Sequence, residues 1–161
     1  MSIRLIVEPS VAPLVGRCVY VQSDHSLDFV LDDARDRGAI DRTSLTLGML
    51  QLEVDIQTRL LMYVWGYHPR AAWKEGVVNA PRAVPGGLRI DPSVHLAPGV
   101  SQAVGDEQSW FSTYDAKNGW LFIDRHSNEA PDAVVEFARG ILIGLASSRC
   151  VALWLHPSMS E

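Results

Sequence analysis

The chain has 161 residues, of which 47% are hydrophobic and 20% are charged, and its formal net charge is −5. This is enough apolar material for one folded domain and too much for a disordered chain. An acidic chain without a cluster of Lys and Arg lacks the surface that neutralises phosphates, so we expect neither a nucleic acid nor an anionic membrane as a partner.

Cys18 and Cys150 stand alone, without the CxxC spacing of a metal or redox motif. We expect two free, buried thiols, although the sequence leaves a disulfide between them open. Residues 1–21 do not resemble a signal peptide, and the longest apolar run near the end, 141–145, is too short to cross a bilayer. By default we expect a cytoplasmic protein with no metal and no cofactor.

The first half of the chain contains several short β patterns. A short strand near residue 3 leads through a Pro-Ser-Val loop into strands at 19–24 and 27–33. A hairpin is expected to join 45–56 to 60–67 through a turn at Gln57-Thr58. For the strand at 27–33, the alternative is a helix over 26–38, with Ser26 as N-cap and Gly38 just past its end.

The second half begins after a connector at 70–87 that is rich in Pro and Gly. Asn118-Gly119 predicts a type I′ hairpin turn, because this dipeptide readily supplies two positive φ angles. A further hairpin is expected to join 134–145 to 150–155 through Ser147-Ser148. The segment 132–147 also fits a helical stripe capped by Asp132, but two interior glycines and several β-branched residues favour a strand.

The two halves resemble each other in a collinear series of residues. The matched pairs keep the same order along the chain: Pro9 and Pro92, Asp24 and Asp115, Gly48 and Gly140, Trp65 and Trp154, Pro69 and Pro157. The series predicts one domain over 1–161 that contains internal repeats at 3–69 and 88–157. The other interpretation is that two β-meanders resemble each other only in composition.

These patterns predict a mainly β fold, with α+β as the alternative if one or two of the ambiguous segments are short helices. Two similar meander halves would form one barrel-like or sandwich domain, and closure of the sheet would remove its edges.

The strand 60–67 is the best candidate for a binding surface. It is apolar on both faces, and Tyr63, Trp65 and Tyr67 share one of them with Leu61. Aromatic side chains are common in sandwich cores, but they are also enriched at interfaces and pockets. We therefore predict binding residues here and at nearby or equivalent positions: Tyr63, Trp65, Tyr67, His68, Trp73 and Trp154.

Polar candidates are fewer. His68 and His156 each follow a Trp-containing strand and precede a proline, so a metal between them is conceivable, but two histidines alone form a weak ligand set. Glu136 has small neighbours that would leave room beside a half-buried general acid or base. Strand-end or edge positions facing solvent are the commoner interpretation of all three residues.

No sequence motif for catalysis is present, so two classes of function remain. The first is a non-catalytic binding protein whose aromatic face holds a protein partner or an apolar small molecule. The second is a cofactor-independent cyclase, isomerase or hydrolase with an apolar pocket, for which Glu136, His156, Tyr63 and Tyr67 are the candidates. An internal cavity reached by Tyr63 or Glu136 would favour the enzyme or the small-molecule binder, and aromatic side chains exposed outside would favour a protein partner.

Overall fold

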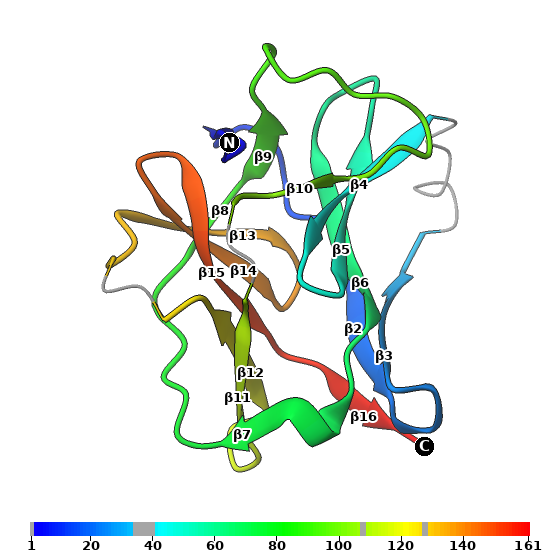
Figure 1. The fold of residues 1–161 in the computed structure, drawn as a ribbon, viewed down its shortest axis with the longest axis vertical. Coiled ribbons are helices and arrows are strands. Elements are labelled where there is room, and N and C mark those ends of the chain that lie inside the picture. Colours follow the sequence, from blue (N-terminus) through cyan, green and yellow to red (C-terminus); the bar gives the residue numbers. More distant parts are fainter. Residues whose placement is uncertain (1, 34–40, 107–108, 127–128) are drawn as a thin grey trace.

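The computed structural model describes residues 2–33, 41–106, 109–126 and 129–161. Two seven-stranded sheets pack face to face as a sandwich, with a two-stranded ribbon beside them (Figure 1). The mainly β prediction is therefore confirmed in its sandwich form. The barrel alternative is wrong, because the sheets do not close on each other.

We name the sheets after the half of the chain that forms most of each. The N-sheet contains, in spatial order, β10 (Gln102–Ala103), β4 (Arg42–Leu47), β5 (Leu50–Asp55), β6 (Leu61–Tyr67), β3 (Ser26–Leu31), β2 (Gly16–Val21) and β16 (Ser158–Ser160). The C-sheet contains β7 (Trp73–Glu75), β11 (Phe111–Asp115), β12 (Trp120–Asp124), β15 (Arg149–Leu155), β14 (Ile141–Ala146), β13 (Ala133–Ala138) and β8 (Val84–Pro85).

The ribbon pairs β1 (Leu5–Glu8) with β9 (Gly87–Ile90), and Leu5 lies opposite Ile90. The described helical segments are two short 3₁₀ turns, Gln22–Asp24 and Arg70–Ala72. No helix in the described part of the chain is long and apolar enough to cross a membrane.

Both ambiguous segments are strands where the structure describes them. Ser26–Leu31 forms β3, while residues 34–38 of the alternative helix lie outside the described residues. The segment 132–147 forms β13 and β14, which turn at Gly140 with a φ of 74°. The helix alternatives are therefore wrong, because β-branched residues and a left-handed glycine decide the local structure.

Two predicted strands were too long. Residues 45–56 divide into β4 and β5 around Gly48, whose φ is 60°, just as 134–145 divides around Gly140. The turn at Ser147-Ser148 is confirmed, and both residues have positive φ. The type I′ prediction at Asn118-Gly119 is wrong, since of these two only Gly119 has a positive φ.

The five central strands occur in the same order in both sheets, namely β2-β3-β6-β5-β4 and β11-β12-β15-β14-β13. Cross-strand pairs also correspond: Tyr20–Leu27 and Leu27–Gly66 in the N-sheet match Tyr114–Leu121 and Leu121–Leu155 in the C-sheet. Both sheets have a register shift at the same place, beside the pairs Val54–Leu61 and Leu145–Cys150. These agreements support the repeat at 3–69 and 88–157, which stays a prediction. The predicted pairs Asp24–Asp115 and Gly48–Gly140 are wrong, because the register matches Val21 to Asp115 and Met49 to Gly140.

The segment that follows each half forms an edge strand of the other half's sheet. The chain leaves β6 of the N-sheet and forms β7, which pairs with β11 of the C-sheet. It later leaves β15 of the C-sheet and forms β16, which pairs with β2 of the N-sheet. The two sheets are therefore interlocked as well as packed.

A segment that we call the strap, residues 76–83, runs across the outer face of the C-sheet from β7 to β8 (Figure 1). Its Val78 is only 4% exposed and belongs to a small apolar cluster with Trp154 and Leu142. The buried Asp115 carboxylate accepts a 3.0 Å hydrogen bond from the Val78 amide and so fixes the start of the strap.

The main core lies between the sheets and consists mostly of Leu, Ile and Val. Strands β14 and β15 are buried on both faces, as their nearly continuous apolar sequence requires. Cys18 and Cys150 are buried and form no disulfide with each other, and burial raises the pKa of the Cys18 thiol to about 12. The Cys18 thiol is therefore not a reactive thiolate candidate at neutral pH.

Candidate functional site

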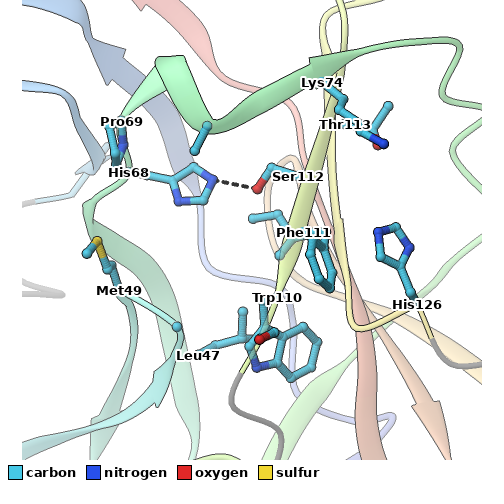
Figure 2. Close-up of a pocket in the computed structure, with 14 residues that line it drawn as sticks. Leu47, Met49, His68, Pro69, Lys74, Trp110, Phe111, Ser112, Thr113 and His126 are labelled. Carbon is cyan, nitrogen blue, oxygen red and sulfur yellow. Dashed lines mark hydrogen bonds between the residues drawn. The ribbon is translucent and has the colours of Figure 1, made fainter.

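Two hollows have lining residues suited to binding. The larger, which we call the intersheet cleft, has a volume of about 640 Å³. Its walls come from the β4–β5 turn and the segment after β6 on one side, and from β11 with the end of β12 on the other (Figure 2). The cleft exists because the chain leaves the N-sheet after Tyr67 and crosses to the C-sheet as β7.

A histidine–serine pair lies in the wall of the cleft. His68 Nε2 lies 2.8 Å from Ser112 Oγ, within hydrogen-bonding distance (Figure 2). Burial lowers the pKa of His68 to about 4, so the ring is neutral at pH 7. A neutral imidazole beside a hydroxyl is the arrangement of a base and a nucleophile. The described contacts of the ring are with Ser112 and Trp73, and do not include a carboxylate that would orient it as in a triad.

The lining of the cleft varies in polarity. Leu47, Met49 and Trp110 lie near the β4–β5 turn, whereas Lys74 and His126 lie apart from them, beside Thr113 and Phe111 respectively (Figure 2). His126 Nδ1 is 3.5 Å from the Asp124 carboxylate, and its ring stacks on Phe111 with centroids 4.1 Å apart. The cleft therefore offers an apolar surface with cationic and imidazole groups apart from it.

The smaller hollow, which we call the outer hollow, has a volume of about 270 Å³ and is lined by Asp28, Phe29, Glu53, Tyr63 and Trp65. It lies where β3 leaves β6, since these strands pair only through Ser26 and Leu27. The Phe29 and Tyr63 rings stack there with centroids 5.5 Å apart and planes within 7° of parallel.

Charge in the outer hollow comes from two carboxylates. Burial raises the pKa of Glu53, although the Trp65 indole donates a hydrogen bond to it and Arg42 lies 3.9 Å away, both of which favour its ionised form. Arg42 also donates to the Tyr63 hydroxyl at 3.1 Å. Asp28 is exposed at the rim. The outer hollow thus combines aromatic rings with anionic oxygens, a chemistry suited to a cation.

The predicted binding residues are divided between these places. Tyr63 and Trp65 line the outer hollow, and Tyr67, 50% exposed, follows them on β6. His68 lines the intersheet cleft. Trp154 is buried beneath the strap and reaches neither hollow.

Trp73 packs between the two equivalent tyrosines, Tyr20 and Tyr114, with ring centroids 4.7 and 5.3 Å away. Arg70 lies 6.0 Å from the Trp73 ring. The buried Trp73 Nε1 has no hydrogen-bond partner among the described residues. Trp73 therefore belongs to the packing between the sheets more than to a binding surface.

The predicted catalytic candidates lie away from the cleft. The Glu136 carboxylate accepts a hydrogen bond from the Gly140 amide at 3.1 Å. The His156 ring lies 3.0 Å from the Asn118 carbonyl oxygen and 4.7 Å from the Trp120 ring, centroid to centroid. The predicted equivalence of His156 with His68 is wrong by one residue, because the register matches Leu155 to Gly66 and hence His156 to Tyr67.

The sequence interpretation missed Ser112, Trp110, Asp28 and Glu53 as site residues. Each lies in a strand or beside one with ordinary alternation, so no local signal distinguished it. Only the pairing of distant strands brings them to the hollows.

Comparison of the sequence with models of known protein families and with curated proteins gives no match. Among the described residues there is no group of three or more His, Cys, Asp or Glu side chains placed to hold a metal ion.

Proposed function

We propose that this chain is a non-catalytic binding protein that holds a protein partner on the outer face of its N-sheet, with a cationic side chain of the partner in the outer hollow. The observation that carries the proposal is a difference between equivalent surfaces. Trp154 on the C-sheet is 7% exposed beneath the strap, whereas the equivalent Trp65 on the N-sheet is 39% exposed.

The equivalence follows from the strand register. Val64 pairs with Leu52 in the N-sheet as Leu153 pairs with Ile143 in the C-sheet. Counting outward from these pairs, the hollow residues Asp28, Glu53, Tyr63 and Trp65 correspond to Phe122, Gly144, Ala152 and Trp154. On the C-sheet these positions are apolar and covered by the chain itself, and on the N-sheet they are polar or aromatic and open.

Open aromatic side chains with a polar surround are typical of protein interfaces. Trp and Tyr are enriched among the residues that dominate binding energy. They contribute most when surrounding contacts exclude water from them. Trp65 and Tyr67 are both exposed, on one strand and one face. The sequence analysis predicted that aromatic side chains exposed outside would favour a protein partner.

Charge complementarity supports the choice of a cationic group. The Asp28 and Glu53 carboxylates flank the Phe29, Tyr63 and Trp65 rings. Arg42 offsets part of this charge beside Glu53, and Asp28 remains at the rim. An Arg or Lys side chain would contact both a carboxylate and an aromatic face there.

The test uses photo-crosslinking in the source organism, from a crosslinking residue placed at Gln51, which precedes Glu53 on β5. A cationic protein should be captured, and Asp28→Asn with Glu53→Gln should reduce its yield at least about tenfold, because a charge pair and its hydrogen bonds are lost. The same residue placed at Val77, 79% exposed on the strap, is the control. Capture from Val77 as strong as from Gln51, or yield unchanged by the charge-removing pair, would contradict the proposal.

A second test needs no partner. A short peptide with one Arg should shift the NMR signal of the Trp65 indole N–H, which donates to Glu53, and the same peptide with citrulline in place of Arg should not. Equal shifts from both peptides would show that charge is not what the hollow recognises.

A further inference from the structure

We infer that the intersheet cleft is a second binding site, for a small organic anion with an apolar body. This site does not depend on the proposed function, since the cleft and the outer hollow share no lining residue.

The size and enclosure of the cleft suit a small molecule. About 640 Å³ falls within the range of 300–1,000 Å³ that is usual for ligand pockets. Both sheets contribute walls, so a ligand there would contact Met49 of the β4–β5 turn and Phe111 of β11 together.

The apolar wall would hold the body of the ligand. Met49 is 62% exposed at the tip of the β4–β5 turn, and the Trp110 side chain lies beside that turn, with its Cβ 3.9 Å from the place a Cβ on Gly48 would take. Both side chains line the cleft, together with the buried Leu47 (Figure 2). Flexible Met and rigid Trp side chains are common at ligand surfaces.

Another part of the cleft supplies the charge preference. Lys74 and His126 both line it, and none of the described lining residues is Asp or Glu. The whole chain has a formal charge of −5, so this lining runs against the average of the protein. The Asp124 carboxylate, 3.5 Å from His126 Nδ1, is not among the lining residues. The Lys74 ammonium group therefore favours a carboxylate, sulfonate or similar anion.

The His68–Ser112 pair provides a neutral polar contact in the same cleft. The Ser112 hydroxyl and the His68 ring already satisfy each other at 2.8 Å. They therefore add no charge that would repel the anion, and the hydroxyl keeps further hydrogen-bonding capacity for a polar group of the ligand.

The experiment compares two fluorescent probes of similar shape, 8-anilinonaphthalene-1-sulfonate, which is anionic, and N-phenyl-1-naphthylamine, which is neutral. Lys74→Met should weaken binding of the anionic probe about threefold to tenfold and leave the neutral probe within about twofold, because a single exposed charge pair is removed. Trp110→Ala should weaken both probes by about tenfold or more, since it removes the largest apolar contact.

Matched variants keep the result interpretable. Met49→Ser changes an exposed side chain of the same wall and should weaken both probes even if Trp110→Ala fails to fold. Trp65→Ala, in the outer hollow, should change neither. The inference is overturned if Lys74→Met affects the two probes equally, if neither Met49→Ser nor Trp110→Ala weakens binding, or if Trp65→Ala lowers the affinity as much as the cleft variants.

Discussion

The N-sheet and the C-sheet have the same order of central strands and the same register shift, yet their outer faces differ. On the C-sheet, Phe122 and Trp154 are packed ring to ring at 5.0 Å beneath the strap. On the N-sheet the equivalent residues are Asp28 and Trp65, beside a hollow that no described segment covers. Packing between the sheets therefore determines the residues on the core-facing side of each sheet. The residues on the outer side depend on whether another segment of the chain covers them.

The difference also shows why the open face is not simply apolar. A large uncovered apolar patch would favour aggregation. Glu53 and Asp28 occupy positions that are Gly144 and Phe122 on the covered face, and they keep the aromatic residues in polar surroundings. The open face is thus suited to reversible contact, and the covered face to permanent contact.

The largest effect should come from truncating the covered tryptophan. Trp154→Ala is expected to lower the free energy of unfolding by about 3–5 kcal/mol, because a buried indole leaves a cavity under the strap. Trp65→Ala, at the equivalent open position, should cost only about 1 kcal/mol. Urea unfolding of both variants measures this, and equal losses would mean that the two faces are equally buried in solution.

The histidines also differ in exposure, since His68 is half-buried and His156 is exposed. The folded His68 takes up a proton only near its lowered pKa of about 4, whereas in the unfolded chain it does so near its usual 6.5. The unfolded state therefore binds more protons between these values, and stability is full above pH 6.5 and falls as the pH is lowered toward 4. The loss is on the order of 3 kcal/mol.

The free energies of unfolding of the wild type and of His68→Gln, measured at pH 7 and pH 4.5, isolate the contribution of His68 protonation. The wild type should lose more stability than the variant on acidification, while His156→Gln, which changes an exposed ring, should behave as the wild type does. A pH dependence unchanged in His68→Gln would show that His68 is not buried as described.

Gly144 and Glu53 occupy equivalent positions in the two sheets, and substitutions there should change stability less. A Cβ at Gly144 would lie 3.0 Å from Trp154 Cζ3 and 3.2 Å from Pro131 Cβ. Gly144→Ala should therefore destabilise the fold by about 1–3 kcal/mol through overpacking. Glu53→Ala on the open face serves as the matched control in the same thermal or urea unfolding experiment and should change stability much less.

The smallest effect has the opposite sign. Because burial raises the pKa of Glu53, the folded state holds this proton to a higher pH than the unfolded chain, and its ionisation reduces stability at neutral pH. Glu53→Gln should stabilise the protein at pH 7 by a few tenths of a kcal/mol after solvent screening, and the gain should vanish near pH 4. The same variant is expected to weaken partner binding, so a loss of stability at pH 7 would count against a buried charge in the hollow.

The sequence predicted the β class because most of its strands carry their own evidence. Alternation in β4 and β5, the apolar runs of β14 and β15, and the turn residues Ser147-Ser148 are local features, readable without a partner strand. The lengths of strands were less readable, because Gly48 and Gly140 can lie inside a strand or end it. Only the left-handed backbone observed at both resolves the choice.

The prediction of a type I′ turn at Asn118-Gly119 is wrong because a side chain outside the dipeptide organises this loop. Asp115 accepts hydrogen bonds from the amides of Lys117 and Asn118 and from the Asn118 side chain, at 3.0, 3.2 and 2.9 Å. This side chain organises a longer loop, closed by the Gly119 amide bonding to the Asp115 carbonyl at 2.7 Å. A side chain outside the dipeptide therefore overrides its usual preference.

The candidate sites were only partly predictable. Tyr63, Trp65 and Tyr67 were found because they alternate along one strand, and His68 because it ends that strand. Ser112 could not be found as the neighbour of His68, because that contact requires the chain to cross between the sheets. Asp28 enters the outer hollow only because β3 leaves β6 after two residues.

The exchange of β7 and β16 has a consequence for synthesis on the ribosome. The N-sheet has all its internal strands once residue 67 has been made, but one edge stays unpaired until residues 158–160 emerge and form β16. The nascent N-terminal half would meanwhile expose the open backbone of β2, a surface that invites pairing with other chains. A ribosome stalled once residues 1–67 have emerged should therefore present a chain that is more sensitive to protease than residues 1–161.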